Sequence, residues 1–215
     1  MSRPEVAVID YGVGNLLSVG RALEHCGATV TVTSEHHCIL SAGRVVLPGV
    51  GAFANAMAEL RTRGLDSVLG EVAARGTPLL GICLGMQLLL SASEEFGVTQ
   101  GLELIPGKVV AIDATAEDGS SLKIPHVGWN ALRPATVGLQ WGGTVLREVQ
   151  PEEAVYFVHS FAAFPADQRH LIAHCTYGGR AIPAVVARDN VVGCQFHPEK
   201  SGEVGLRVLR GFLTS

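Results

Sequence analysis

Cys83 is the residue whose neighbours best suit covalent chemistry. An apolar run at 78–82 leads into the pattern Gly81-x-Cys83-x-Gly85, and a helical pattern follows directly. This is the pattern of a nucleophile elbow, a sharp strand-to-helix turn that exposes the nucleophile and needs small neighbours. A helix beginning after the cysteine would favour the thiolate, and the N–H of Leu84 would be placed to bind an oxyanion. A buried structural cysteine between incidental glycines is the alternative.

His197 offers the proton shuttle that such a thiol needs. It follows the apolar segment 191–196 and lies two residues before Glu199. Side chains two apart in an extended segment point the same way, so we expect the carboxylate to orient the imidazole and stabilise its protonated form. Pro198 would stiffen the connection. A His-Pro turn with a solvated glutamate would explain the same residues.

Two further patterns suggest ligand sites but are weak. His36, His37 and Cys38 are potential metal ligands, but three adjacent side chains cannot all face one ion, and no distant ligand set joins them. Segment 10–15 contains the Gly-x-Gly of a dinucleotide-binding loop, but Leu17 stands where the third glycine belongs. We therefore predict no metal and no cofactor.

Composition narrows the class of protein. The 215 residues suit one domain, 1–215, and 47% hydrophobic residues are ample for its core. A net charge of −4 without a basic stripe argues against a nucleic-acid partner. No segment is long and apolar enough to span a membrane, and residues 1–5 lack the apolar core of a signal peptide. The five cysteines form no C-x-x-C pair, which favours reduced thiols and a cytoplasmic location.

The pattern of hydrophobic residues predicts an α/β fold. Short apolar runs predict strands at 6–9, 44–47 and 78–82, and a β-branched run predicts another at 29–33. Helical periodicity predicts helices at 16–25, 52–63, 65–74, 84–91 and 203–213. This alternation is typical of a mostly parallel sheet with helices on both faces. Turn residues separate further strands in the second half, some of which should be antiparallel: 108–112, 154–158, 171–173, 184–187 and 191–195. The polar stretch 113–123 should be an exposed loop.

Two motifs together resemble a known family. Segment 81–87, Gly-Ile-Cys-Leu-Gly-Met-Gln, and segment 197–199, His-Pro-Glu, resemble the class I (triad) glutamine amidotransferases, in which a cysteine is followed by His-x-Glu. Additional motifs resemble one branch, the glutaminase subunits of imidazole glycerol phosphate synthase. These motifs lie at 10–15, 47–53, 125–130, 156–160 and 197–201, so the resemblance spans essentially the whole chain.

This resemblance implies a flavodoxin-like α/β fold and an enzyme without a cofactor. The enzyme would hydrolyse L-glutamine to glutamate and ammonia through a cysteine thioester. The implied partner is a (β/α)₈-barrel cyclase, which would form a heterodimer with this chain and receive the ammonia. The cyclase would produce imidazole glycerol phosphate and aminoimidazole carboxamide ribotide in L-histidine biosynthesis. Glutamine hydrolysis would be slow until the cyclase and its nucleotide bind.

The resemblance also implies roles for particular residues. Cys83 would attack the glutamine carbonyl, His197 would pass the proton to the leaving ammonia, and Glu199 would orient His197. The oxyanion and glutamine site would comprise Gly49, Val50, Gly51, Leu84, Gln87, Glu95, Ser160 and Phe161. Phe161 replaces a tyrosine common in the family, so only a backbone contact would survive there. The face toward the cyclase would comprise Asn15, His126, Trp129, Asn130, Tyr156 and Lys200, although core packing would explain Trp129 equally well.

Two other functions would fit parts of the same pattern. Another triad amidotransferase or a free γ-glutamyl hydrolase would share the triad, but segments 47–53 and 125–130 argue against it. A binding module could keep the fold without catalysis. The intact Cys83, His197 and Glu199 argue against that alternative.

Overall fold

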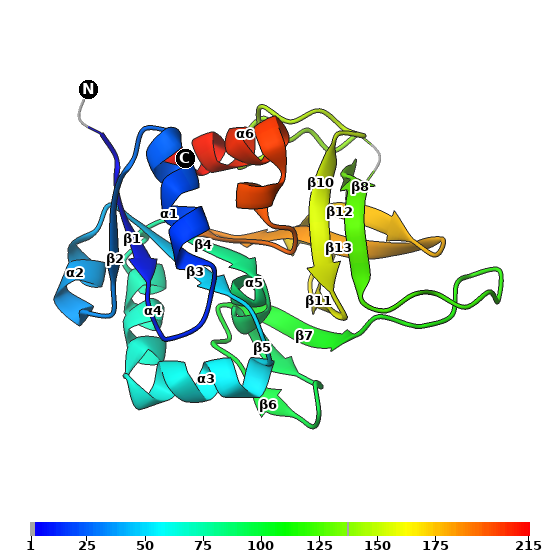
Figure 1. Ribbon diagram of the computed structural model, residues 1–215, viewed down its shortest axis with the longest axis horizontal. Coiled ribbons are helices and arrows are strands. Elements are labelled where there is room, and N and C mark those ends of the chain that lie inside the picture. The colour runs from blue at the N-terminus through cyan, green and yellow to red at the C-terminus, as the bar shows by residue number, and fades with distance from the viewer. Residues whose placement is uncertain (1–2, 137) are drawn as a thin grey trace.

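A mixed sheet of eight strands runs through the centre of the molecule (Figure 1). The computed structural model describes residues 3–136 and 138–215 of the chain. The strands of this sheet are β1 (Glu5–Ile9), β2 (Thr29–Thr33), β3 (Arg44–Gly49), β4 (Leu79–Cys83), β9 (Arg133–Pro134), β12 (Leu171–Tyr177), β13 (Arg180–Arg188) and β14 (Val191–Cys194). Their order is β2-β1-β3-β4-β14-β13-β12-β9. Neighbours from β2 to β14 are parallel, and neighbours from β14 to β9 are antiparallel.

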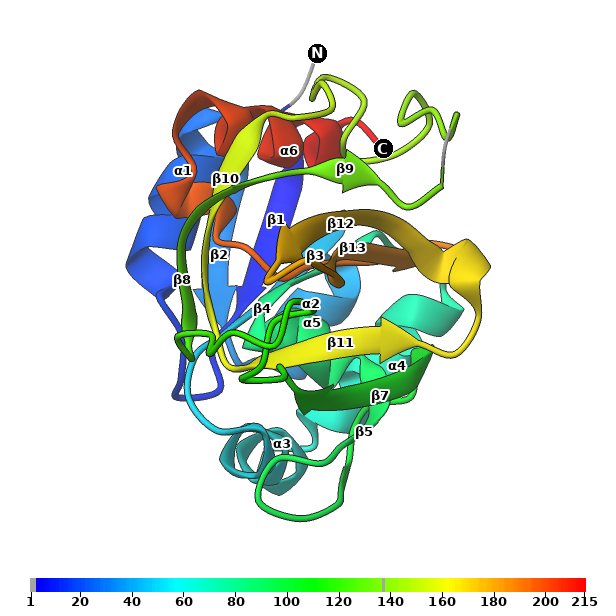
Figure 2. The ribbon, with the colours of Figure 1, turned by 90° about the vertical axis from the view of Figure 1, so that its right-hand side faces the viewer.

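Helices cover both faces of the parallel part because successive strand residues point to opposite sides. Val8 and Val46 pack toward α1 (Leu16–His25) and α6 (Gly202–Leu213). Val45 and Leu47 pack toward the helices of the other face: α2 (His36–Ser41), α3 (Phe53–Thr62), α4 (Leu65–Ala74) and α5 (Leu84–Leu88). The two layers are visible on either side of the sheet in Figure 2. The predicted α/β fold, a mostly parallel sheet with helices on both faces and antiparallel strands in the second half of the chain, is confirmed.

Two smaller sheets lie against the antiparallel strands of the central sheet. One is an antiparallel ribbon of β8 (His126–Ala131) and β10 (Ala154–His159). The other contains β5 (Leu90–Ser93), β6 (Thr99–Gln100), β7 (Ile105–Ala111) and β11 (Phe161–Pro165). Ser160 is the single residue between β10 and β11, so it connects the ribbon to the second small sheet. Two short 3-10 turns, Gln168–His170 and Pro198–Lys200, complete the described elements.

One predicted helix is wrong. The pattern predicted a helix over 84–91, but α5 ends at Leu88 and strand β5 begins at Leu90. The carbonyls of Leu88 and Leu89 accept hydrogen bonds from the returning segment 102–105 instead of from a further helical turn. A non-local backbone pairing therefore overrides the local helical preference.

Other differences are smaller. The helix over His36–Ser41 and the strand His126–Ala131 were not predicted. Strand β3 continues through Pro48 to Gly49 instead of ending at 47. The stretch 113–123 is largely exposed, as predicted, and a bridge between Thr115 and Ser121 closes it into a turn.

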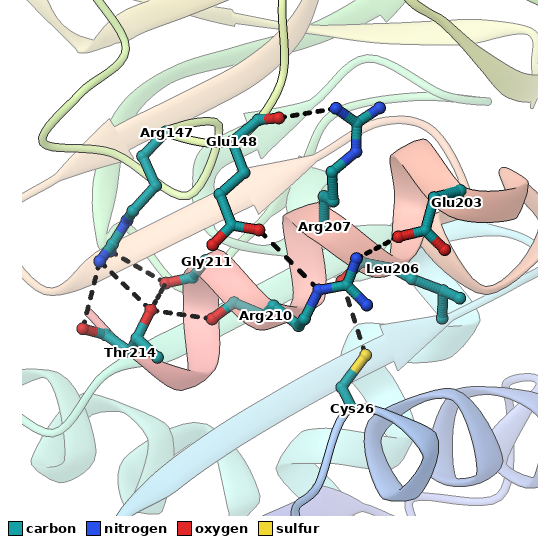
Figure 3. A network of polar contacts seen from close by, with 9 residues as sticks. All are labelled: Cys26, Arg147, Glu148, Glu203, Leu206, Arg207, Arg210, Gly211 and Thr214. Carbon is teal, nitrogen blue, oxygen red and sulfur yellow. Dashed lines mark hydrogen bonds and ion pairs between the residues drawn. The ribbon is translucent and has the colours of Figure 1, made fainter.

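The carboxyl end of α6 is held by arginine side chains (Figure 3). Arg147 donates to the backbone oxygen of Gly211 at 2.9 Å and to that of Thr214 at 3.2 Å. Arg44 donates to the backbone oxygen of Phe212 at 3.0 Å. The last carbonyls of a helix lack backbone partners within the helix, so these guanidinium groups supply charged donors there, in addition to the hydroxyls of Thr214 and Ser215.

Replacing Arg147 by alanine should lower the free energy of unfolding by about 1.5–3 kcal/mol, because charged donors to helix-end carbonyls are lost. Urea denaturation followed by circular dichroism measures this change. The matched control is Arg169→Ala, since that side chain is 88% exposed and pairs with its neighbour Asp167. The control should keep the wild-type stability. Equal losses of stability in both variants would contradict a specific role of Arg147 at the end of α6.

Candidate active site

Cys83 occupies a strained turn between β4 and α5. Its backbone has φ 56° and ψ −112°, a region that residues with a side chain rarely adopt. A Cβ atom added to Gly81 would lie 2.7 Å from the backbone of Gly85, and one added to Gly85 would lie 1.8 Å from the carbonyl oxygen of Leu47. Both glycines are therefore required by close backbone packing, as the elbow pattern predicted.

His197 and Glu199 form a buried pair beside the elbow. His197 Nδ1 donates to Glu199 Oε1 at 2.8 Å, and the two side chains are only 3% and 1% exposed. The predicted extended geometry is wrong, since the glutamate lies within the 3-10 turn Pro198–Lys200. This turn is anchored by the hydrogen bond from His197 N to Tyr156 O at 3.0 Å and by Ser201 Oγ, which donates to His197 O at 2.6 Å.

The surroundings of His197 favour its protonated form. Burial lowers the pKa of His197, but interactions with Cys83 and Glu199 outweigh burial and raise the pKa to about 9. His197 Nε2 has no hydrogen bond of good geometry among the described residues. A buried imidazolium next to a thiol is the arrangement that supports thiolate chemistry.

Glu199→Gln should lower the pKa of His197, because an opposite charge is removed from the imidazole. The folded value of about 9 lies above the ordinary value of 6.5. Protonated His197 therefore stabilises the fold below about pH 6.5, and this contribution is lost as the pH rises through about 9. NMR titration of the His197 ring measures the pKa, and denaturation at several pH values measures the stability. The wild type should lose more stability across this window than Glu199→Gln. An unchanged His197 pKa in the variant would contradict the role of the carboxylate.

The thiol opens onto a cleft of about 460 Å³. Its size suits a ligand as small as one amino acid. Cys83 and His197 line the cleft together with most of the predicted glutamine-site residues: Val50, Gly51, Leu84, Gln87, Glu95, Ser160 and Phe161. Gly49 lies behind this lining, where an added Cβ atom would be 2.6 Å from Tyr11 Oη. The structure therefore brings these predicted residues together.

The loop at 50–51 leaves the central sheet beside the elbow. Gly49 is the register partner of Cys83 in the parallel pair of β3 and β4. The buried phenol of Tyr11 donates to Pro48 O at 2.8 Å and so holds the end of β3. Gly51 has φ +98°, a conformation that favours glycine. The backbone N–H groups of Val50 and Leu84 thus belong to two adjacent turns, as an oxyanion site with two donors requires.

Two predicted substrate contacts already have partners within the chain. Glu95 Oε2 accepts from the backbone N–H of Phe53 at 2.6 Å, so this carboxylate holds the start of α3 at the rim of the cleft. Gln87 Nε2 donates to Phe161 O at 3.1 Å and to Gln195 Oε1 at 3.0 Å. Both residues therefore shape the cleft, in addition to any direct contact with a substrate.

Gln195 is a site residue that the sequence analysis missed. Its side chain is fully buried, and its Nε2 lies 3.8 Å from Cys83 Sγ. The signal that could have revealed it is its spacing of two residues from His197, because alternate residues of an extended segment share a side.

The remaining thiols differ from Cys83 in their surroundings. Burial raises the pKa of Cys175 to about 12 and that of Cys194 well above its usual range. Cys26 and Cys38 are half-buried, and neither lines the cleft. Within residues 3–136 and 138–215, no cluster of His, Cys, Asp or Glu side chains is placed to hold a metal ion. The same part of the chain contains no helix long and apolar enough to cross a bilayer.

The predicted partner face is only partly exposed. Trp129 is 59% exposed and meets its register partner Tyr156 edge to face, with 6.1 Å between ring centroids. Trp129 is therefore a surface residue and not part of the core. Lys200 is exposed, and Asn15 is half-buried. His126 is only 3% exposed, so the expectation that it belongs to this surface is wrong. Asn130 is half-buried, and its amide bonds to protein groups.

Known proteins resemble this chain along nearly its whole length. A family model described as glutamine amidotransferase class-I matches residues 7–214. The imidazole glycerol phosphate synthase subunit HisH 1 of Legionella pneumophila (strain Paris) is 49% identical over 97% of this chain and 98% of its own length. The subunit HisH of Geobacillus thermodenitrificans is 45% identical over 97% of this chain and 94% of its own length.

Solved structures show the same fold at low sequence identity. A crystal structure of a glutamine amidotransferase superposes with a TM-score of 0.70 at 17% identity and covers 97% of both chains. The structure of PurLQS from Thermotoga maritima superposes with a TM-score of 0.70 at 18% identity and covers 99% of both chains. These structures confirm the predicted fold class, and the sequence relatives confirm the predicted family. The chain belongs to the class-I glutamine amidotransferases and, among them, to the HisH subunits of imidazole glycerol phosphate synthase.

Proposed function

We propose that this chain is a glutaminase subunit that hydrolyses L-glutamine at Cys83 and supplies the ammonia to a cyclase subunit for L-histidine biosynthesis. The observation that carries the proposal is the strained Cys83 elbow facing the buried His197–Glu199 pair in a cleft of about 460 Å³. The HisH relatives, whose names give a subunit of imidazole glycerol phosphate synthase, supply the biosynthetic setting.

The reaction follows from the placement of these groups. Cys83 Sγ attacks the side-chain carbonyl carbon of glutamine while His197 holds the thiol proton. The N–H group of Leu84 and, after a peptide rotation, that of Val50 stabilise the oxyanion of the tetrahedral intermediate. The C–N bond breaks, His197 returns the proton to the leaving nitrogen, and ammonia departs from a thioester. Water then attacks the thioester, and glutamate leaves as the thiol is restored.

The proposed partner is a (β/α)₈-barrel cyclase that docks on the β8–β10 ribbon as a heterodimer. Support comes from two exposed apolar side chains there, Trp129 at 59% and Val127 at 52%. A dry interface would let ammonia pass on without meeting water, where it would be protonated and lose its nucleophilic form. Neither nucleic acid nor a membrane is proposed as a partner, consistent with the net charge of −4. The cytoplasmic location stays a prediction.

The test is glutamate release from glutamine by the whole chain, measured alone and with the cyclase subunit and its ribonucleotide substrate. Release that rises when the cyclase and ribonucleotide are present supports the proposal. Release that ignores the cyclase would favour a free hydrolase, and no release in any mixture would favour a binding module.

Trp129→Ala should weaken binding of the cyclase by about 10- to 100-fold, because a large exposed aromatic side chain is a typical anchor of an interface. Isothermal titration calorimetry measures the dissociation constant. Val32→Ala is the control, since Val32 is 47% exposed on strand β2, at the far edge of the central sheet. If a folded Trp129→Ala variant bound the cyclase with unchanged affinity, the interface would have to lie outside the ribbon.

A further inference from the structure

Two buried histidines next to the cleft have no role in the proposed reaction. His126 and His159 are register partners in the β8–β10 ribbon and are only 3% and 6% exposed. His126 Nδ1 lies 3.0 Å from His159 Nε2, so one hydrogen bond joins the rings. His159 lines the cleft, while His126 lies farther back between the rings of Tyr177 and Phe157, at centroid distances of 4.1 and 5.0 Å.

The connections of the pair fix where each proton lies. The carbonyl oxygen of Phe161 can only accept, so His159 Nδ1, 2.9 Å away, must donate. A neutral His159 ring then accepts at Nε2, which makes His126 Nδ1 the donor between the rings. His126 Nε2 is left as an acceptor, and it lies 3.3 Å from Asn130 Nδ2.

Asn130 is the first donor of this series of hydrogen bonds, and its side-chain amide can take only one orientation. Its Oδ1 accepts from the backbone N–H of Ala131 at 2.8 Å, and its Nδ2 donates to Thr176 O at 2.8 Å. Reversing the amide would place two donors against each other at Ala131 and two acceptors at Thr176. The nitrogen therefore faces His126, and every hydrogen bond runs in one direction from Asn130 toward the cleft.

Both rings lie where a positive charge is unfavourable. Burial, together with the nearby His126 and His197, lowers the pKa of His159 to about 4, even though its hydrogen bond to Phe161 O acts in the opposite direction. Burial also lowers the pKa of His126. An additional proton on His159 Nε2 would point at the N–H of His126 and break the bond between the rings.

The last hydrogen bond of this series, from His159 to Phe161 O, lies in the wall of the cleft. The carbonyl of Phe161 accepts from His159 Nδ1 and also from Gln87 Nε2, at 2.9 and 3.1 Å. Two donors from different elements thus hold one peptide oxygen. This oxygen follows Ser160, so its position sets the path of the segment 160–161 along the cleft.

We propose that His126 and His159 are positioning residues, both neutral and protonated at Nδ1, that hold the Phe161 carbonyl and thereby shape the glutamine site. They tie this wall of the cleft to the β8–β10 ribbon. The role in glutamine binding rests on the proposed function, whereas the protonation pattern of the two histidine rings does not. The two parts are therefore tested separately.

The protonation pattern is tested by ¹⁵N NMR of the ring nitrogens of the wild-type chain near neutral pH. Both rings should show a protonated Nδ1 and an unprotonated Nε2. An Nε2–H form or a doubly protonated ring at either histidine would overturn the proposal. This measurement needs no enzymatic activity, so a failure of the proposed function would be seen independently of it.

The positioning role is tested by glutamine kinetics of the complex with the cyclase. His126→Leu should raise KM for glutamine about tenfold with little change in kcat, because one hydrogen bond that shapes the binding wall is lost. His126→Asn keeps a donor near the place of Nδ1 and should recover most of the loss. Alkylation of Cys83 by iodoacetamide should proceed at the wild-type rate in both variants.

The matched control is His174→Asn, which changes a half-buried strand histidine outside the chain of hydrogen bonds. It should keep the wild-type KM. A fall in kcat at constant KM in His126→Leu would overturn the positioning role, as would equal effects in His174→Asn. If His126→Leu does not fold, the NMR result and the His126→Asn kinetics still decide.

Discussion

Glutamate release should disappear in Cys83→Ala, with a loss of at least roughly 1,000-fold, because the thiol that lines the cleft and forms the thioester is removed. The fold should persist, since alanine retains the Cβ atom and only the sulfur is removed from the cleft. Glutamate release with the cyclase present measures the loss, and thermal denaturation checks the fold.

Ammonium salts provide the control for this variant. When ammonia is supplied directly, the complex of Cys83→Ala with the cyclase should still form the cyclase products, since the two chemistries occupy separate sites. Substantial glutamate release by Cys83→Ala would contradict the assignment of the nucleophile. A loss of the ammonia-dependent reaction as well would indicate that the variant disrupts the complex and not only the thioester.

Gly85→Ala should lower the free energy of unfolding by at least about 3 kcal/mol, a large effect for one methyl group. The added Cβ atom would lie 1.8 Å from Leu47 O and 2.9 Å from Leu47 C. These are backbone atoms of the buried strand β3, so the collision can be relieved only by moving α5 away from the sheet. Urea denaturation measures the loss.

Gly70→Ala is the matched glycine control. Gly70 lies within helix α4, and no atom outside its local helix approaches an added Cβ within 4 Å. Alanine there should raise stability by up to about 1 kcal/mol, because it is the better helix former. Similar losses in both variants would mean that the contact with Leu47 is not what makes glycine necessary at position 85.

The parts of the site that could be predicted depend on short-range sterics. The elbow needs small residues at 81 and 85 because its strand and helix touch immediately, so the requirement is visible in five consecutive residues. The parallel strands could be predicted for the same reason, because each is a short run of apolar or β-branched residues bounded by its own turn. The pairing of His197 with Glu199 was foreseen, although a 3-10 turn and not an extended strand produces it.

The parts that could not be predicted depend on contacts between distant segments. Strand β5 replaces the end of the expected helix because segment 102–105 returns to take its carbonyls. The contact of Gln87 with Gln195 joins positions 108 residues apart, and that of His126 with His159 joins positions 33 apart. A polar residue in such a pair has no periodic signature in its own segment, so only the folded chain reveals its partner.

Strand β2 has a consequence for handling the protein in concentrated solution. It forms one edge of the central sheet (Figure 1), and its five residues alternate threonine and valine without a charge or a proline. An edge strand of this kind presents unpaired backbone groups that a second molecule can extend. We expect self-association and precipitation to begin at Thr29–Thr33, where a lysine in place of the half-exposed Val32 would act as a gatekeeper.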